Sequence, residues 1–176
     1  MSSADILEMV KESQLDMGFV TEPVTAGSSV QRIPLYKERF VLLANPSHPL
    51  TKVPEIHISD FKKYTFVIID PQSSISKIVN QFLIANNMVP DSVIEISSVA
   101  TIKELLKEEH MITLLPELFA KDEIKKGLLA SLAISPTPPD LTTSLIYTNN
   151  YQRMDIIDTI IKEVKDIIDN TLQLKY

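Results

Sequence analysis

Apolar positions along the chain follow two periods, one typical of strands and one typical of helices. Short apolar runs predict buried strands at residues 15–20, 40–44, 64–69, 93–96, 111–115 and 142–147. Between them, apolar residues that recur every three or four positions predict helices with apolar stripes that start at residues 6, 75, 102 and 156, and a further helix over 117–126. Ser2 or Ser3 can cap the first of these helices. Strands that alternate with helices are typical of βαβ units, so we expect an α/β protein with mainly parallel sheets.

The segments between these elements are predicted from their turn and capping residues. Residues 24–34 are polar and are expected to be irregular, whereas residues 128–134 are expected to be extended. The helix at 117–126 should end with Gly127 as its C′ residue. The isoleucine stripe of the last helix is better explained as core than as a surface that binds a partner.

Two connectors, around residues 44–50 and 135–141, divide the chain. The segment between them, residues 44–141, is expected to form an inner lobe. The flanking residues 1–43 and 142–176 would pair to form a smaller outer lobe. Two α/β lobes that are joined by two strands form a cleft, which is where small molecules bind in such proteins.

Composition and charge exclude several classes of function. The 176 residues are 44% hydrophobic and 23% charged, which is typical of a soluble globular protein. The net charge of -6 argues against nucleic-acid binding by this chain itself. The absence of cysteine excludes disulfides and thiol nucleophiles, and the presence of only three glycines excludes glycine-rich phosphate loops. No apolar run reaches the roughly 20 residues that cross a bilayer, and the N-terminus has no signal pattern, so we expect a cytoplasmic protein.

Six short segments, in order along nearly the whole chain, resemble the effector-binding domain of LysR-type transcriptional regulators. They correspond to a D-x-G-I/V strand, a "pL" and "vlv" stretch, an HPL motif, a short helical piece, an LLP motif and a G-x-L motif. The matching residues are 15–20, 34–35 with 40–43, 48–50, 58–61, 112–116 and 127–129. The pair His110-Met111 departs from the family, which usually has a glycine-containing turn there.

The resemblance implies a two-lobed fold like that of type 2 periplasmic binding proteins, with a small-molecule effector in the cleft. It also implies a homo-oligomer and DNA binding only through an N-terminal winged helix-turn-helix. This domain, and the first strand–helix–strand of the effector domain, have no counterpart in the 176 residues. We therefore expect a truncated outer lobe with an open sheet edge, and self-association or local disorder near the N-terminus.

The loop after the predicted strand at 64–69 is the first candidate ligand site. Ser73 and Ser74 stand where a strand passes into a helix, so free N–H groups and the helix dipole favour an anion there. A plain helix cap explains the same two serines. The resemblance places this loop against the effector, and Pro71 and Gln72 would contact it through the backbone or the amide.

Other candidate ligand contacts lie at the ends of other strands. Thr21 ends the strand at 15–20, and the carboxyl ends of strands commonly line ligand crevices. Ser98 stands at the next strand-to-helix junction, where it or a Thr101/Glu104 capping box would begin the helix. Leu115 and Pro116 are expected to shape the cleft wall.

Two alternatives to a ligand-binding regulatory domain stay open. An enzyme on the same scaffold would need acid–base groups, and Asp70 and Glu22 are the only carboxylates near the predicted strand ends. We expect no catalytic residue, no cofactor and no metal, because the three histidines are scattered and no nucleophile motif is present. The second alternative is a shortened interaction module that pairs with a full-length regulator.

Overall fold

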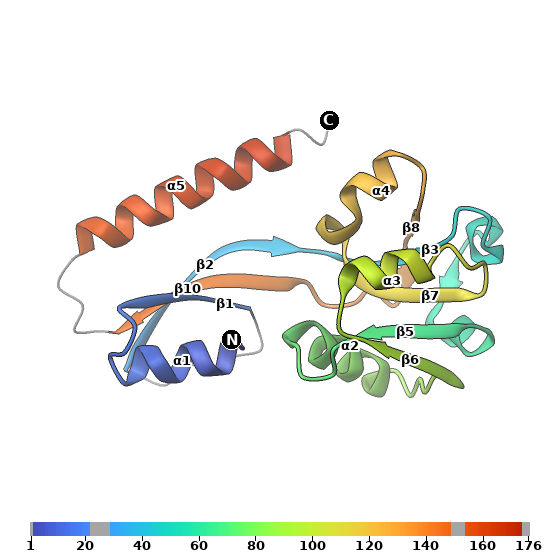
Figure 1. Cartoon of the computed structure of the whole chain (residues 1–176), viewed down its shortest axis with the longest axis horizontal. Coiled ribbons are helices and arrows are strands. Elements are labelled where there is room, and N and C mark those ends of the chain that lie inside the picture. Colours follow the sequence, from blue (N-terminus) through green and yellow to red (C-terminus); the bar gives the residue numbers. More distant parts are fainter. Residues whose placement is uncertain (1, 22–28, 149–153, 174–176) are drawn as a thin grey trace. The chain divides into compact units, whose positions relative to one another are not determined.

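The computed structural model of the chain describes residues 2–21, 29–148 and 154–173. The chain divides into two compact units (Figure 1). The first unit combines Met1–Lys37 with Thr142–Tyr176, and the second unit is the continuous segment Glu38–Leu141. The first division therefore falls earlier than the expected position between residues 43 and 44, because the strand that begins at Phe40 pairs inside the second unit.

A three-stranded sheet forms the centre of the first unit. The order of its strands is β1 (Met17–Thr21), β10 (Leu141–Thr148) and β2 (Val30–Glu38). β1 runs antiparallel to β10, and the register pairs Phe19 with Leu145 and Gly18 with Ile146. Because side chains alternate along a strand, Leu145 and Ile146 face opposite sides of this sheet.

One helix lies on each side of this sheet (Figure 1). Helix α1 (Ser3–Lys11) begins with a capping box between Ser2 and Asp5, and its buried Leu7 and Val10 pack with Ile146. Helix α5 (Met154–Gln173) packs its buried Ile157 against Leu145 and Tyr147 on the other side. The two helices thus give the small sheet two separate apolar clusters.

A five-stranded sheet forms the centre of the second unit. The order of its strands is β6 (Ser92–Ile96), β5 (Thr65–Ile69), β7 (Met111–Pro116), β3 (Phe40–Ala44) and β8 (Ala130–Leu132). β5 is parallel to both of its neighbours, whereas β3 is antiparallel to β7 and to β8. The expectation of mainly parallel sheets is therefore wrong, since both units contain antiparallel pairs. Parallel pairs need long crossovers, and in the five-stranded sheet α2 (Ser74–Ala85) and α3 (Val99–Leu105) lie in the connections from β5 to β6 and from β6 to β7.

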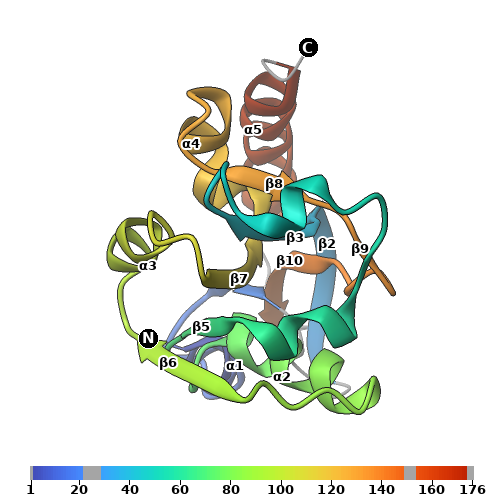
Figure 2. The same ribbon diagram turned by 90° about the vertical axis from the view of Figure 1, so that its right-hand side faces the viewer.

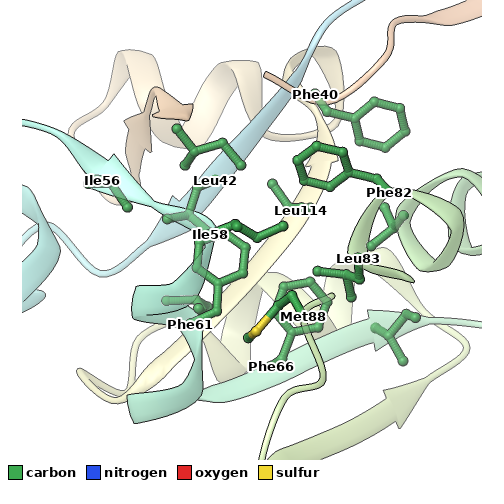
Figure 3. Packing of buried hydrophobic residues seen from close by; sticks show 14 of the residues in the cluster. Phe40, Leu42, Ile56, Ile58, Phe61, Phe66, Phe82, Leu83, Met88 and Leu114 are labelled. Carbon is green, nitrogen blue, oxygen red and sulfur yellow. The ribbon is translucent and has the colours of Figure 1, made fainter. Parts of the chain in front are cut away.

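Helices α2 and α3 cover opposite faces of the β5–β6–β7 part of this sheet (Figure 2). The larger apolar cluster lies on the α2 face and contains Phe40, Leu42, Phe66 and Phe82 (Figure 3). The cluster on the α3 face contains Leu43, Val67, Ile102 and Leu115. A sheet that is covered on both faces explains why its strands appear in the sequence as continuous apolar runs.

Short elements complete the second unit. They are η1 (Pro49–Lys52), β4 (Ile56–His57), η2 (Ile58–Lys63), η3 (Glu117–Ala120), α4 (Lys121–Lys125) and β9 (Ile134–Ser135). β4 and β9 form a parallel two-stranded sheet. Gly127 follows α4 with a φ of +69°, which is the left-handed conformation expected of a C′ glycine.

Two further expectations need correction. Residues 30–34, expected to be irregular, are part of strand β2, and residues 24–28 lie outside the described residues. β2 pairs with β10, and this pairing makes the segment a strand although its polar local sequence does not predict one. The stripe of α5 is core only near β10, because Ile157 is buried whereas Ile167 is 63% exposed.

Candidate functional site

Three parallel strands of the second unit end at the same edge of the sheet. The register pairs Ile69, the last residue of β5, with Ile96, the last residue of β6. The N–H of Asp70 donates to the carbonyl of Ile96 at 3.1 Å, which joins the two chain segments just beyond the strands. β7 runs parallel to β5 from the pair Thr65–Met111 onward, so it ends at this edge too. We call this edge the strand-end site: residues 70–74, 97–98 and 115–116.

The loop from Asp70 to Ser73 is held by its own hydrogen bonds. The Asp70 carboxylate accepts from the N–H of Gln72 at 3.0 Å, and the Asp70 carbonyl accepts from the N–H of Ser73 at 2.9 Å. The side chains of Pro71 and Gln72 are exposed at the surface of this turn. The conformation of this turn is therefore fixed by hydrogen bonds within the loop itself.

Ser73 and Ser74 have different tasks in this loop. The hydroxyl of Ser73 accepts from the N–H of Ser76 at 3.1 Å and so caps helix α2. The hydroxyl of Ser74 has no hydrogen-bond partner among the described residues, and its side chain is half-buried. The N–H groups of Ser74 and Ile75 occupy the first positions of α2, where no intrahelical acceptor exists. Two N–H donors, a hydroxyl and the positive end of the helix dipole together favour an anionic or strongly polar group.

Ser76, which our sequence reasoning did not single out, fixes the start of α2 to the sheet. Its side chain is fully buried, and its hydroxyl donates to the carbonyl of Ile69 at the end of β5. The sequence feature that could have revealed this role is a serine in the first turn of a helix that begins shortly after a strand. Such a serine can bond to a nearby carbonyl instead of to water.

The remaining predicted residues of the second unit also have structural roles. Ser98 caps α3 by accepting from the N–H of Thr101 at 3.4 Å, so Ser98 rather than the Thr101/Glu104 box begins this helix. Leu115 has no exposed surface and packs in the core, and Pro116 is buried as well. Ser98 is thus exposed at the strand-end site, whereas Leu115 and Pro116 are buried at the end of β7.

Thr21 ends strand β1 in the first unit. Its N–H donates to the hydroxyl of Ser3 at 3.0 Å, and the two hydroxyls lie 3.2 Å apart. In the same sheet, Nε of Arg32 donates to the hydroxyl of the fully buried Ser144 at 3.1 Å. The structure therefore ties Thr21 to the start of α1.

The described residues offer little for acid–base or metal chemistry. The Asp70 carboxylate is exposed and serves the turn, and Glu22 lies outside the described residues. Within residues 2–21, 29–148 and 154–173, no three His, Cys, Asp or Glu side chains are grouped so that they could hold a metal ion. Across the same ranges, no helix has the length and apolar character needed to span a membrane.

Comparison with known proteins identifies the family. The model of the LysR substrate binding domain matches residues 1–167. The chain belongs to this family. A hydrogen peroxide-inducible genes activator of Haemophilus influenzae is 23% identical over 172 residues, which cover 93% of this chain and 56% of the activator. The chain thus spans about half the length of this curated relative.

Solved structures show the same fold. The CcmR regulatory domain of Synechocystis PCC6803, solved in complex with 2-PG, has a TM-score of 0.79 at 18% identity over 95% of this chain and 80% of that one. The effector binding domain of QuiR, solved in complex with shikimate, has a TM-score of 0.68 at 17% identity over 85% and 70% of the two chains. This LysR substrate-binding domain therefore has the α/β fold of type 2 periplasmic-binding-protein-like regulatory domains.

Proposed function

We propose that this LysR substrate-binding domain senses a small organic anion, which it binds at the strand-end site of the second unit. The observation that carries this proposal is the unused donor set at the start of α2, where the Ser74 hydroxyl and two N–H groups have no acceptor among the described residues. The neighbours CcmR and QuiR were solved with 2-PG and shikimate, both small polar molecules. Pro71, Gln72, Ser73 and Ser98 would complete the contacts, while Leu115 and Pro116 would shape the floor.

The proposal extends to the whole regulator. The two units would correspond to the two regulatory subdomains of the family, and Thr21 stays a predicted ligand contact within the first unit. Ligand binding would change the domain only through different affinities for two conformations. DNA would be bound by a separate domain of a longer cytoplasmic regulator, and this chain would have no catalytic activity. No observation on the described residues favours the enzyme or the interaction-module alternative.

We also propose that the chain forms homo-oligomers. β1 is an edge strand of the first unit's sheet, and its Phe19 is 45% exposed. An edge strand with an exposed apolar side chain offers both backbone hydrogen bonds and apolar surface to a second copy of the chain. Sedimentation velocity would show a mass above that of one chain, and a monomer at all concentrations would refute this part.

A thermal-stability screen against small organic acids tests the ligand proposal. A ligand at about 100 times its dissociation constant adds roughly 2.7 kcal/mol, which raises the unfolding midpoint by several degrees. In Ser74→Ala the ligand-induced shift should shrink while the melting temperature without ligand stays the same, because this hydroxyl makes no bond to any residue that the structure describes.

The control is Ser59→Ala, which removes another exposed hydroxyl from the second unit, outside the strand-end site. A cooperative protein that no compound stabilises would refute the proposal. A ligand-bound structure with only apolar contacts at residues 71–74 would refute the anion assignment alone.

A further inference from the structure

His48 is the one histidine buried in the described part of the chain, and its ring has two different nitrogens. Nδ1 accepts from the N–H of Leu50 at 3.1 Å and so caps the short helix η1. Nε2 is buried and has no partner among the described residues. A neutral imidazole that accepts through Nδ1 carries its proton on Nε2, so the tautomer is set by this cap.

The turn segment Asn45–Val53 is organised around this histidine. The N–H of His48 donates to the carbonyl of Asn45 at 2.9 Å, and the carbonyl of His48 accepts from the N–H and the hydroxyl of Thr51. Leu50 is 2% exposed and packs in the larger apolar cluster. The capped turn therefore seats Leu50 in the core of the second unit.

Several elements surround the imidazole. The ring of Tyr64, which follows η2, lies with its centroid 4.3 Å from that of His48. Glu109 favours the charged ring and His110 disfavours it, so these two neighbours act in opposite directions. The lysines on η1 and η2 are exposed to solvent: Lys52, Lys62 and Lys63. Burial, the largest effect, lowers the pKa of His48 below the ordinary histidine value of 6.5.

We propose that His48 is an acid-labile latch, in which uptake of one proton at Nδ1 releases the turn segment Asn45–Val53 from the second unit. A proton on Nδ1 would face the N–H of Leu50, so that one donor would meet another and the cap would be lost. The charged ring would also be enclosed without a partner, which is costly in a protein interior. Both effects disappear when the segment opens and the ring reaches water, so protonation and opening are coupled.

The direction of the pH effect follows from the lowered pKa. The open form binds a proton near pH 6.5, whereas the closed form binds it only at lower pH. The closed form is therefore favoured above that pH and loses its advantage as the pH falls below it. One proton per opening event corresponds to about a tenfold rise in the opening equilibrium constant per pH unit.

Amide hydrogen exchange between about pH 7.5 and about pH 5.5 tests the latch. After correction for the intrinsic exchange rate, protection of the Leu50 amide should fall by about tenfold per pH unit below about 6.5. In His48→Asn, an amide oxygen replaces Nδ1 as the acceptor and does not titrate, so this dependence should vanish. In His57→Asn and His110→Asn, two exposed histidines are removed, and the dependence should remain.

Three results would overturn the proposal. The pH dependence could persist in His48→Asn, or it could disappear in His110→Asn. The Leu50 amide could also exchange with the same free energy as the amides of β5 and β7, which would mean global unfolding rather than a local release. Should His48→Asn fail to fold, ¹⁵N spectra of the wild-type imidazole give the answer, since titration of His48 without any change in Leu50 protection also refutes the latch.

Discussion

At the scale of single residues, neighbouring serines with the same side chain serve different purposes. Ser73 caps α2, Ser76 binds the carbonyl of Ile69, and Ser74 keeps its hydroxyl without a partner in the described residues. The difference arises because the N-cap position places the Ser73 hydroxyl against an N–H of the first turn, while the buried Ser76 hydroxyl must find a bond. The candidate ligand site therefore depends on Ser74 more directly than on the serine that precedes it.

Ser73→Ala separates the cap from ligand binding. Loss of the N-cap should lower the free energy of unfolding by about 1 kcal/mol, without any ligand present. Urea denaturation measures this change, and Ser97→Ala should stay within about 0.5 kcal/mol of the wild type. Equal stability of Ser73→Ala and the wild type would show that the cap contributes nothing.

At the scale of elements, close approach of backbones decides which helix can lie on which strand. Gly18 in β1 faces α1, and a Cβ at this position would overlap with Cγ2 of Ile6. Gly127 is required for a different reason: its φ is positive, which is a conformation that favours glycine, whereas a Cβ there would meet nothing within 4 Å. One glycine thus permits packing between elements, and the other permits a helix to end.

A double-mutant cycle distinguishes these two uses of glycine. Gly18→Ala should destabilise the protein by about 1–3 kcal/mol, since α1 must move away from β1. The same change in an Ile6→Ala background should cost less, with a coupling energy of about 1 kcal/mol or more. Gly127→Ala should cost about 1 kcal/mol in either background, because only its backbone is strained. Additive effects of Gly18→Ala and Ile6→Ala would contradict the packing explanation.

At the scale of the whole molecule, the two units differ in how their cores are assembled. Both apolar clusters of the second unit consist of residues between Phe40 and Leu141. The clusters of the first unit join residues before Lys37 to residues after Thr142, for example Val10 to Ile146. Formation of the first unit therefore requires the closure of a long loop, whereas formation of the second does not.

The isolated segment Glu38–Leu141 should consequently fold by itself. We expect a cooperative urea transition and a far-ultraviolet circular dichroism spectrum with helix and strand signals. A mixture of peptides 1–37 and 142–176 serves as the comparison and should show no cooperative transition, because its two halves must meet without a connecting chain. Noncooperative melting of Glu38–Leu141 would show that its core depends on the first unit.

The sequence-based predictions were accurate for features that depend on nearby residues and failed for a strand that depends on a distant one. The strands β3, β5, β6 and β7 were predicted at nearly their observed positions, since burial on both faces produces continuous apolar runs. The caps at Ser73, Ser98 and Gly127 were predicted as well, because capping depends on chemistry within a few residues. β2 was missed, because its order comes from pairing with β10, more than a hundred residues away.

The amino-acid sequence by itself determined the α/β class, the positions of most elements and the family, because each depends on local periodicity or on short motifs in order. Only the tertiary structure decided the direction of strand pairing, the partial exposure of the α5 stripe and the difference between Ser73 and Ser74. It also decided that His48, part of a turn motif with two prolines, is buried with one nitrogen engaged. These properties depend on contacts between residues distant in sequence, and local sequence patterns do not record such contacts.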